Sequence, residues 1–126
     1  MHPSDNPRVI AGQGTCSVEI LDEVPDLDLF VTPVGGEGLL SGTALAVRSP
    51  SSHARLVGAE PVAADDARRS LLSGTLFPSG NPRTIADGLR TSLGPTTLPT
   101  VRGLRVAVIL SGGNVNLSRL PWALTA

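Results

Sequence analysis

Three short aliphatic runs constrain the fold of this chain more than any other feature. They cover residues 27–34 (LDLFVTPV), 54–60 (ARLVGAE) and 104–110 (LRVAVIL), and each is bounded by turn-forming residues. Apolar runs of this length predict strands that are covered on both faces, as in parallel sheets. The core has to be aliphatic, because only two phenylalanines and one tryptophan occur among the 126 residues. This length fits a single domain.

Segments with helical spacing alternate with these runs. Cap-forming Asp5 and Asn6 precede Pro7, which suits a first helical turn. Helices are expected at about residues 7–24, 38–48, 64–72 and 117–124. Residues 73–102 are rich in Gly, Pro and Thr, and predict only a short element at 84–89. The order predicts an α/β fold with an open, mainly parallel sheet and flanking helices, whose strands all end at one edge.

Charge and cysteine content narrow the class of partner. The net charge is −1 and the arginines are scattered, which argues against a nucleic-acid or membrane surface and favours a small-molecule ligand. The lone Cys16 is expected to be a small core residue in a protein of the reducing cytoplasm. No apolar stretch is long enough to predict a membrane span. All ten basic residues are arginine, so lysine chemistry is closed to this chain alone.

The first aliphatic run leads into VGGEGLL, a glycine bend before a predicted helix. Backbone N–H groups at such a helix start can hold an anion, and Gly35, Gly36 and Gly38 would let a phosphate approach. A tight turn without a ligand is the alternative. The spacing differs from the dinucleotide fingerprint, and a P-loop would need a lysine.

Two further polar groups follow the other strands. Ser111, followed by Gly112, could face the same crevice, or could simply cap a glycine turn. Glu60, Asp65 and Asp66 suit Mg²⁺ or Ca²⁺ with a nearby carbonyl, or they could cap a helix. The two histidines lack companions at the spacing of zinc ligands.

Five ordered motifs carry a family resemblance: HPSDNPRVIAGQGT, VTPVGGEGLLSG, GAEPVAADDARRSL, RTIADGLRTSLG and VAVILSGGNVNL. Together they resemble the serine/threonine dehydratases and serine racemases, which are pyridoxal-phosphate (PLP) enzymes of the tryptophan synthase β-like fold (fold type II). The resemblance implies that the glycine bend cradles the PLP phosphate and that the SGGN serine faces the pyridine nitrogen. It implies a cation site as in the racemase branch, and an ADG segment beside the reactive face of the cofactor. The implied residues are Gly35, Gly36, Glu37, Gly38, Leu39, Ser111 and Gly112 for PLP, Glu60, Ala64 and Asp66 for the cation, and Asp87 and Gly88 for the reactive face.

Three departures from the family pattern matter. Relatives begin upstream, with a segment that carries the Schiff-base lysine, and no lysine occurs here. A second loss is expected near residues 102–104, so that residues 1–126 form one partial PLP-binding domain. Glu37 replaces a usual glycine, which costs on the order of 1–2 kcal/mol if the position is left-handed. Its carboxylate would also repel a phosphate dianion unless it turned outward.

The resemblance predicts a truncated PLP-dependent ammonia-lyase that converts L-serine to pyruvate, or L-threonine to 2-oxobutanoate, and that is inactive alone. Three alternatives stay open: a serine racemase-like member, a generic anion-binding domain, and a non-catalytic remnant or complementing half that binds an N-terminal fragment. The unpaired sheet edge also predicts a tendency to form a homodimer.

Overall fold

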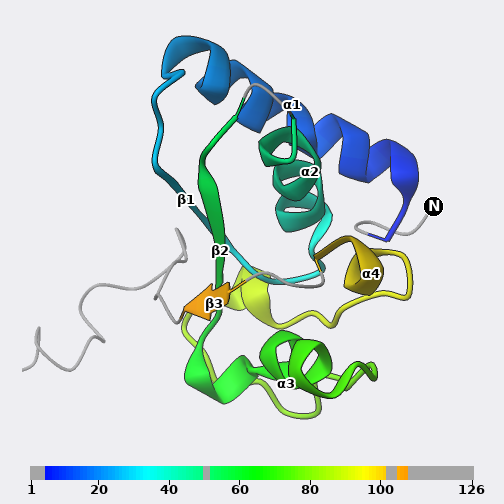
Figure 1. The fold of residues 1–126 in the computed structure, drawn as a ribbon. Coiled ribbons are helices and arrows are strands. Elements are labelled where there is room, and N and C mark those ends of the chain that lie inside the picture. The colour runs from blue at the N-terminus through cyan, green and yellow to red at the C-terminus, as the bar shows by residue number, and fades with distance from the viewer. Residues whose placement is uncertain (1–4, 50–51, 102–104, 108–126) are drawn as a thin grey trace, which may run out of the picture.

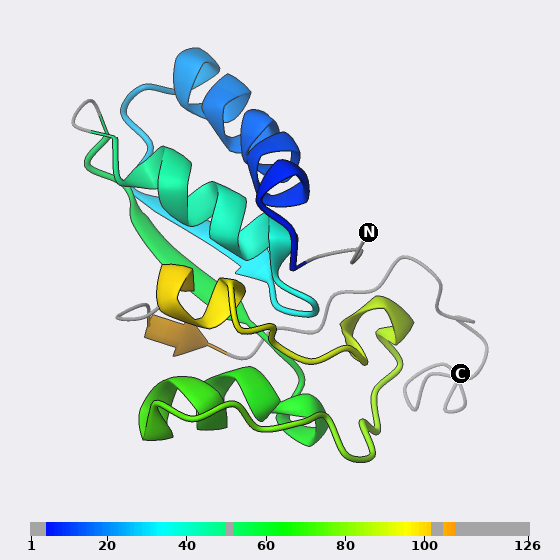
Figure 2. The ribbon, with the colours of Figure 1, turned by 90° about the vertical axis from the view of Figure 1, so that its right-hand side faces the viewer.

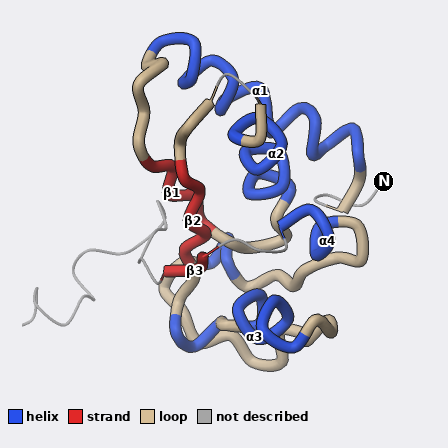
Figure 3. Tube along the Cα trace, viewed as in Figure 1, coloured by secondary structure: helices blue, strands red, loops and turns tan. Residues whose placement is uncertain are grey.

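The computed structural model describes residues 5–49, 52–101 and 105–107, and forms an α/β domain (Figure 1). Its larger elements, in chain order, are α1 (Pro7–Glu23), β1 (Leu29–Pro33), α2 (Gly38–Val47), β2 (Arg55–Ala59), α3 (Asp66–Ser73), α4 (Thr97–Val101) and β3 (Arg105–Ala107). Two short 3-10 helices, η1 (Val62–Ala64) and η2 (Asp87–Leu89), lie on either side of α3 in the sequence. The secondary structure is mapped on the trace in Figure 3.

The three described strands form a parallel sheet in the order β1-β2-β3. In β1 and β2, Leu29 pairs with Arg55 and Pro33 with Ala59, while Val57 pairs with Arg105 of β3. The predicted α/β class and parallel sheet are therefore confirmed. The strands predicted at residues 27–34 and 54–60 are longer than the observed β1 and β2. Residues 104 and 108–110 of the third run and the helix expected at 117–124 lie outside the described residues.

Helix α1 begins as the sequence predicts. The Asn6 side chain caps it by accepting a hydrogen bond from the Arg8 N–H at 2.9 Å, and Pro7 occupies the first turn. Cys16 lies on this helix but is exposed, so the prediction of a core cysteine is wrong. The buried residues of α1 are Ile10, Gly14 and Ser17, and Cys16 lies on the solvent-exposed side of the helix.

Helix α2 lies between α1 and the strands β1 and β2, as Figure 2 shows. The two helices approach closely at two glycines, because a Cβ on Gly42 would collide with the backbone nitrogen of Gly14 and lie 2.5 Å from the Ile10 carbonyl oxygen. Beside this crossing, the buried hydroxyls of Ser17 and Thr43 share a hydrogen bond of 2.7 Å. Small residues and one polar pair therefore hold α1 against α2.

The core lies between the sheet and the helices. Phe30, Leu56 and Leu40 are members of one buried cluster, which also includes Val101 of α4. Alternate residues of β1 face the other way, and Leu29 and Val31 are 40% and 44% exposed. Parallel sheets are usually covered on both faces, so one face of this sheet offers an apolar surface.

The sequence did not predict α4, which lies within the segment expected to be a loop. The Asp5 carboxylate caps it from the other end of the chain, because Oδ1 accepts the N–H groups of Thr96 at 2.9 Å and Thr97 at 3.1 Å. The remaining element of this segment, η2, coincides with the short element expected at residues 84–89. In the described part of the chain, no helix combines the length and the hydropathy that crossing a bilayer requires.

Candidate functional site

The glycine bend joins the carboxyl end of β1 to the first turn of α2. Its backbone is left-handed at Glu37, with φ 69° and ψ 14°. Glu37 is also the N-cap of α2, although its side chain makes no capping hydrogen bond. Position 37 is therefore left-handed, which is the case for which the sequence analysis expected an energetic cost. Glutamate occupies it, at a cost of about 1–2 kcal/mol relative to glycine.

The Glu37 side chain is buried inside the protein. It is 4% exposed, and neither carboxylate oxygen meets hydrogen-bond geometry with a protein partner. Burial raises the pKa of this carboxyl from its ordinary 4.5 to about 9; the nearby Thr97 hydroxyl opposes the rise, and the charges of Asp66, Glu60 and Asp5 add to it. The carboxyl is therefore neutral at pH 7, and the repulsion of a phosphate that the sequence suggested is relieved there.

Two buried hydroxyls on either side of the bend also have no partner. Thr32 Oγ1 lies near the end of β1 and Ser41 Oγ in the first turn of α2, where Ser41 is fully buried. The Ser41 backbone N–H is already used, since it donates to the Glu37 carbonyl at 2.9 Å. Buried polar atoms normally find partners, so these unpaired hydroxyls fit a site that takes up a polar ligand.

The ADG segment lies against the glycine bend; its implied place beside the reactive face of the cofactor stays a prediction. A Cβ on Gly35 would lie 2.9 Å from the Gly88 carbonyl oxygen and 3.1 Å from the Thr91 hydroxyl oxygen. Asp87 itself is exposed and accepts the N–H of Gly88 at 2.9 Å. Gly35 and Gly88, 53 positions apart in the sequence, are therefore in contact in the fold.

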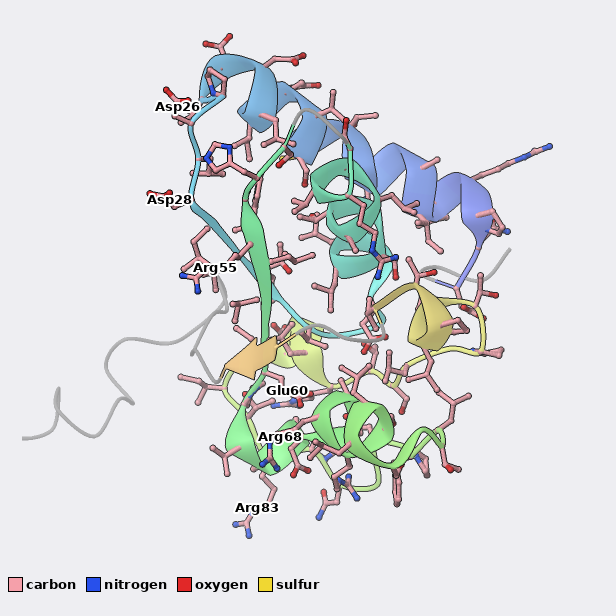
Figure 4. All side chains as sticks on the ribbon, in the orientation of Figure 1. Asp26, Asp28, Arg55, Glu60, Arg68 and Arg83 are labelled. Carbon is pink, nitrogen blue, oxygen red and sulfur yellow. The ribbon has the colours of Figure 1, made fainter. Side chains whose placement is uncertain are left out.

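Glu60 follows β2 and lies between the end of that strand and α3 (Figure 4). Its side chain is 1% exposed, and Oε1 accepts the backbone N–H of Arg68 at 2.8 Å. Burial raises the pKa of Glu60 to about 7, while the Arg68 N–H opposes the rise and Asp66 adds to it. Of the two interpretations left open by the sequence, the helix cap is thus present in the structure.

The implied cation site has its other residues next to this cap. Ala64 and Asp66 line a polar cavity of about 200 Å³, together with Asp65, Arg69 and Asn81. Asp66 is 3% exposed, and burial raises the pKa of its carboxyl. No group of three or more His, Cys, Asp or Glu residues suited to a metal occurs among residues 5–49, 52–101 and 105–107. A site of two carboxylates and the Ala64 carbonyl stays a prediction.

The structure brings together most of the predicted site. The bend, Gly88, Glu60 and Asp66 gather around the first turn of α2 and the carboxyl ends of β1 and β2. Ser111 and Gly112, predicted to face the cofactor ring, lie outside the described residues. Sequence reasoning missed Thr32, Ser41, Thr97 and Asp5. Only Asp5 carried a signal, as a capping residue, but the sequence assigned it to α1.

Comparison with solved structures defines the class of this fold. The chain superposes on maize serine racemase with a TM-score of 0.79 and 44% identity, over 86% of this chain and 33% of that one. It superposes on a threonine deaminase from T.th. with a TM-score of 0.79 and 43% identity, over 85% of this chain and 42% of that one. The fold is therefore that of the tryptophan synthase β-like PLP enzymes, as the sequence predicted.

Sequence comparison identifies the family. A model described as "pyridoxal-phosphate dependent enzyme" matches residues 1–112, so the chain belongs to the family of pyridoxal-phosphate dependent enzymes. Serine racemase of Dictyostelium discoideum is 49% identical over 87% of this chain and 35% of its own length. The β-hydroxyaspartate dehydratase of Paracoccus denitrificans is 34% identical over 97% of this chain and 54% of its own length. The chain thus spans between about a third and about half of these relatives.

Proposed function

We propose that this chain is the part of a PLP-dependent enzyme of hydroxy amino acids that holds the cofactor phosphate. The observation that carries the proposal is the bend at Glu37, where a parallel strand turns into α2 beside two buried hydroxyls without partners. The residues present fit a phosphate group, since backbone N–H groups and a helix N-terminus favour an anion. The cradle consists of Gly35, Gly36, Glu37, Gly38 and Leu39.

The chemistry assigned to the complete enzyme follows from the relatives. Bound PLP supplies an electron sink for the α-carbon of an amino acid. We assign ammonia-lyase activity on L-serine or L-threonine, with serine racemisation as an equally supported alternative, and a cytoplasmic location. Ser111 would face the ring nitrogen as a neutral partner, with Gly112 behind it, and Asp87 and Gly88 would line the reactive face. Glu60, Ala64 and Asp66 would hold a divalent cation.

What the chain does by itself is limited by its side chains. It contains no lysine, so its residues can orient the cofactor phosphate and exclude water from it, but cannot supply an ε-amino group to the reaction. We therefore expect binding without turnover.

The test is to dialyse the purified chain against PLP and measure retention by absorbance, then reduce with borohydride, determine the intact mass and assay pyruvate from L-serine. Retention of PLP without a covalent lysine adduct or pyruvate is expected. Gly35→Ala should lower retention, because its Cβ would lie 2.9 Å from the Gly88 carbonyl oxygen; Gly80→Ala, with nothing within 4 Å of its Cβ, is the matched control. Pyruvate production by the chain alone, or equal retention by Gly35→Ala, would contradict the proposal.

A second candidate is a complementing half, and the exposed sheet face favours it. Leu29 and Val31 present apolar surface on β1, while the structures matched are about two to three times longer than this chain. The proposed occupant is the remainder of the family fold on a separate polypeptide.

Binding to the residues of Dictyostelium serine racemase that this chain does not match would test this second candidate. Capture should be lost in a Leu29→Asp, Val31→Asp double variant and kept in Leu72→Asp, whose side chain is 73% exposed on α3. Equal capture by both variants, or no capture by the unchanged chain, would refute complementation through this face.

A further inference from the structure

We infer that two copies of this chain associate through a groove between α1 and α2, with the two α1 helices antiparallel across a two-fold axis. The groove has a volume of about 440 Å³ and is lined by residues of both helices. Helix α1 lies across α2 from the sheet, as Figure 2 shows, whereas Leu29 and Val31 are exposed on the opposite face of β1. The proposed contact is therefore separate from the exposed face of β1, and it does not depend on binding of a cofactor.

Exposed apolar side chains lie beside small residues in this groove. Val18 of α1 and Leu45 of α2 line it and are 48% and 54% exposed. Gly14 and Gly42, where the two helices approach closely, line it as well. Large side chains beside glycines suit the packing of knobs into holes, in which Val18 or Leu45 of one copy enters the groove of the other. Burial of these side chains removes apolar surface from water, which favours association.

The exposed residues of α1 along the groove follow a heptad pattern. Separated alternately by three and four positions, and all exposed, are Arg8, Ala11, Thr15, Val18 and Asp22. This is the spacing of a seam along which one helix packs against another. Thr15 lies midway between Arg8 and Asp22, so a two-fold axis near Thr15 brings Arg8 of each copy opposite Asp22 of the other.

The charges of α1 identify a second copy as the occupant of the groove. Helix α1 carries one basic residue, Arg8, in its first turn, while Glu19, Asp22 and Glu23 lie toward its other end. A parallel pair would place the acidic ends together. An antiparallel pair places each acidic end beside an arginine and also opposes the two helix dipoles. A two-fold contact requires a surface that complements itself, and the charges of α1 meet this requirement.

The size of the contact sets its expected strength. Helix α1 has 17 residues and is about 25 Å long at 1.5 Å per residue. Two packed helices are about 20 Å wide, so the contact covers at most about 500 Å² per copy, less than the ~800 Å² of a standard interface. We therefore expect a dissociation constant of about 10–100 µM, and weaker association at high salt because the charged ends are exposed to solvent.

Sedimentation equilibrium between about 5 and 500 µM measures this association. The unchanged chain should form a reversible dimer, and Val18→Asp should raise the dissociation constant at least about tenfold, because it places a carboxylate in the apolar part of the contact. Leu72→Asp on α3 is the matched control, since Leu72 is 73% exposed and lies outside the groove. This control and the double variant Leu29→Asp, Val31→Asp should dimerise as the unchanged chain does. Circular dichroism confirms that each variant is folded.

An exchange of charges tests the antiparallel arrangement. Arg8→Glu makes both ends of α1 acidic, and the double variant Glu19→Arg, Asp22→Arg makes both ends basic in sum. Neither change opposes the helix dipole, since acidic residues favour the first turn and basic residues the last. Each variant alone should dimerise more weakly than the unchanged chain, and an equimolar mixture of the two should restore the dimer. A mixture that associates no better than the separate variants would contradict antiparallel pairing.

Disulfide formation locates the two-fold axis. Thr15→Cys in a Cys16→Ser background should form a covalent dimer with oxidised glutathione, because position 15 lies in the groove near the axis. The unchanged chain, whose exposed Cys16 is not part of the groove, should stay uncrosslinked. Cross-linking through Cys16 instead would place the axis on another side of α1 and contradict the proposed contact.

Three results would overturn the inference: a chain that stays monomeric at about 500 µM, a dimer that survives Val18→Asp, and a dimer that Leu29→Asp, Val31→Asp abolishes. The remainder of the family fold is the other candidate occupant. If Val18→Asp abolished capture of the Dictyostelium fragment and left self-association unchanged, the groove would belong to that remainder and not to a second copy.

Discussion

Two regions of helix α2 differ in how completely their buried polar atoms are hydrogen-bonded. Its middle crosses α1 at Gly14 and Gly42, where the backbones touch and the hydroxyls of Ser17 and Thr43 satisfy each other. Its first turn carries Glu37 in a left-handed conformation, with polar atoms of Glu37 and Ser41 buried without partners. Complete satisfaction marks a region that stabilises the fold, whereas incomplete satisfaction in an equally buried region marks one that expects a ligand.

The largest expected effect comes from breaking the crossing itself. Gly42→Ala would place a Cβ against the backbone of Gly14 and Ile10, which cannot yield as a side chain would. We expect a loss of about 3 kcal/mol or more in the free energy of unfolding, at the upper end of overpacking costs. Urea unfolding followed by circular dichroism measures it.

The matched control for this variant is Gly12→Ala on α1, where a Cβ would meet nothing within 4 Å. Alanine there should raise stability by about 0.5–1 kcal/mol through helix propensity. Equal effects of the two substitutions would show that the close approach of the helices does not limit the fold.

The next largest expected effect is a pH dependence of the free energy of unfolding, which Glu37 confers at the start of α2. Folding raises the pKa of Glu37 to about 9, so the folded chain binds a proton there that the unfolded chain has lost. The stability gained is complete below about pH 4.5 and is lost as pH rises through 9. Between pH 7 and pH 8.5, the free energy of unfolding should fall by about 1.4 kcal/mol per pH unit.

Glu60 contributes in the same direction up to about pH 7, and burial also raises the pKa of Asp66, so a Glu37 variant is needed to assign the slope above pH 7 to Glu37. Urea unfolding of Glu37→Gln at pH 7 and 8.5 should give a much flatter profile than the unchanged chain. A Glu37→Gln profile as steep as that of the unchanged chain would assign the pH dependence to another group.

A smaller effect tests whether the polar pair at the crossing is satisfied as the structure has it. Thr43→Val leaves the buried Ser17 hydroxyl without its 2.7 Å partner, which should cost about 1–3 kcal/mol. The double variant Ser17→Ala, Thr43→Val should be closer to the unchanged chain than Thr43→Val is, by thermal or urea unfolding. Additive losses would mean that the two hydroxyls do not act as a pair.

The smallest expected effect concerns the backbone at the bend. Glu37→Gly relieves a left-handed non-glycine residue. At pH 4, where the Glu37 carboxyl is largely protonated in the folded and unfolded chains alike, it should stabilise the chain by up to about 1 kcal/mol, since the cavity left by the side chain offsets part of the gain. A parallel measurement on Glu37→Ala, which keeps the Cβ, should show no such gain. Equal stability of the two variants would mean that backbone strain at position 37 does not lower the stability of the chain.

The sequence predicted those parts of the fold that depend on local pattern. The Asn6 cap, Pro7 and the apolar runs at β1 and β2 act within a few residues, and their elements were found where expected. Helix α4 was missed because its cap, Asp5, lies more than ninety positions away in the sequence. Cys16 was misassigned because average burial of cysteine does not say which face of a particular helix is covered.

For the site, the sequence indicated which residues are involved better than it indicated their burial, protonation and hydrogen bonds. The motif placed Glu37 in the bend and anticipated a left-handed cost, but its burial among Thr97, Glu60 and Asp66 depends on three separate elements. The capping role of Glu60 likewise became visible only through its 2.8 Å contact with the Arg68 N–H, while its role as a cation ligand stays a prediction. Such contacts arise from tertiary packing, which a single sequence does not encode in any local pattern.

The strand order β1-β2-β3 has a consequence for how this chain is made. Each strand pairs with the one that precedes it in the sequence, so the described sheet can grow in the direction in which a ribosome releases the polypeptide. The hydrogen bond between Asp5 and the start of α4 can form only after more than ninety further residues have followed Asp5 from the ribosome. The contact between the Asp5 carboxylate and α4 is therefore expected to form late, after β1 and β2 have been synthesised and can already pair.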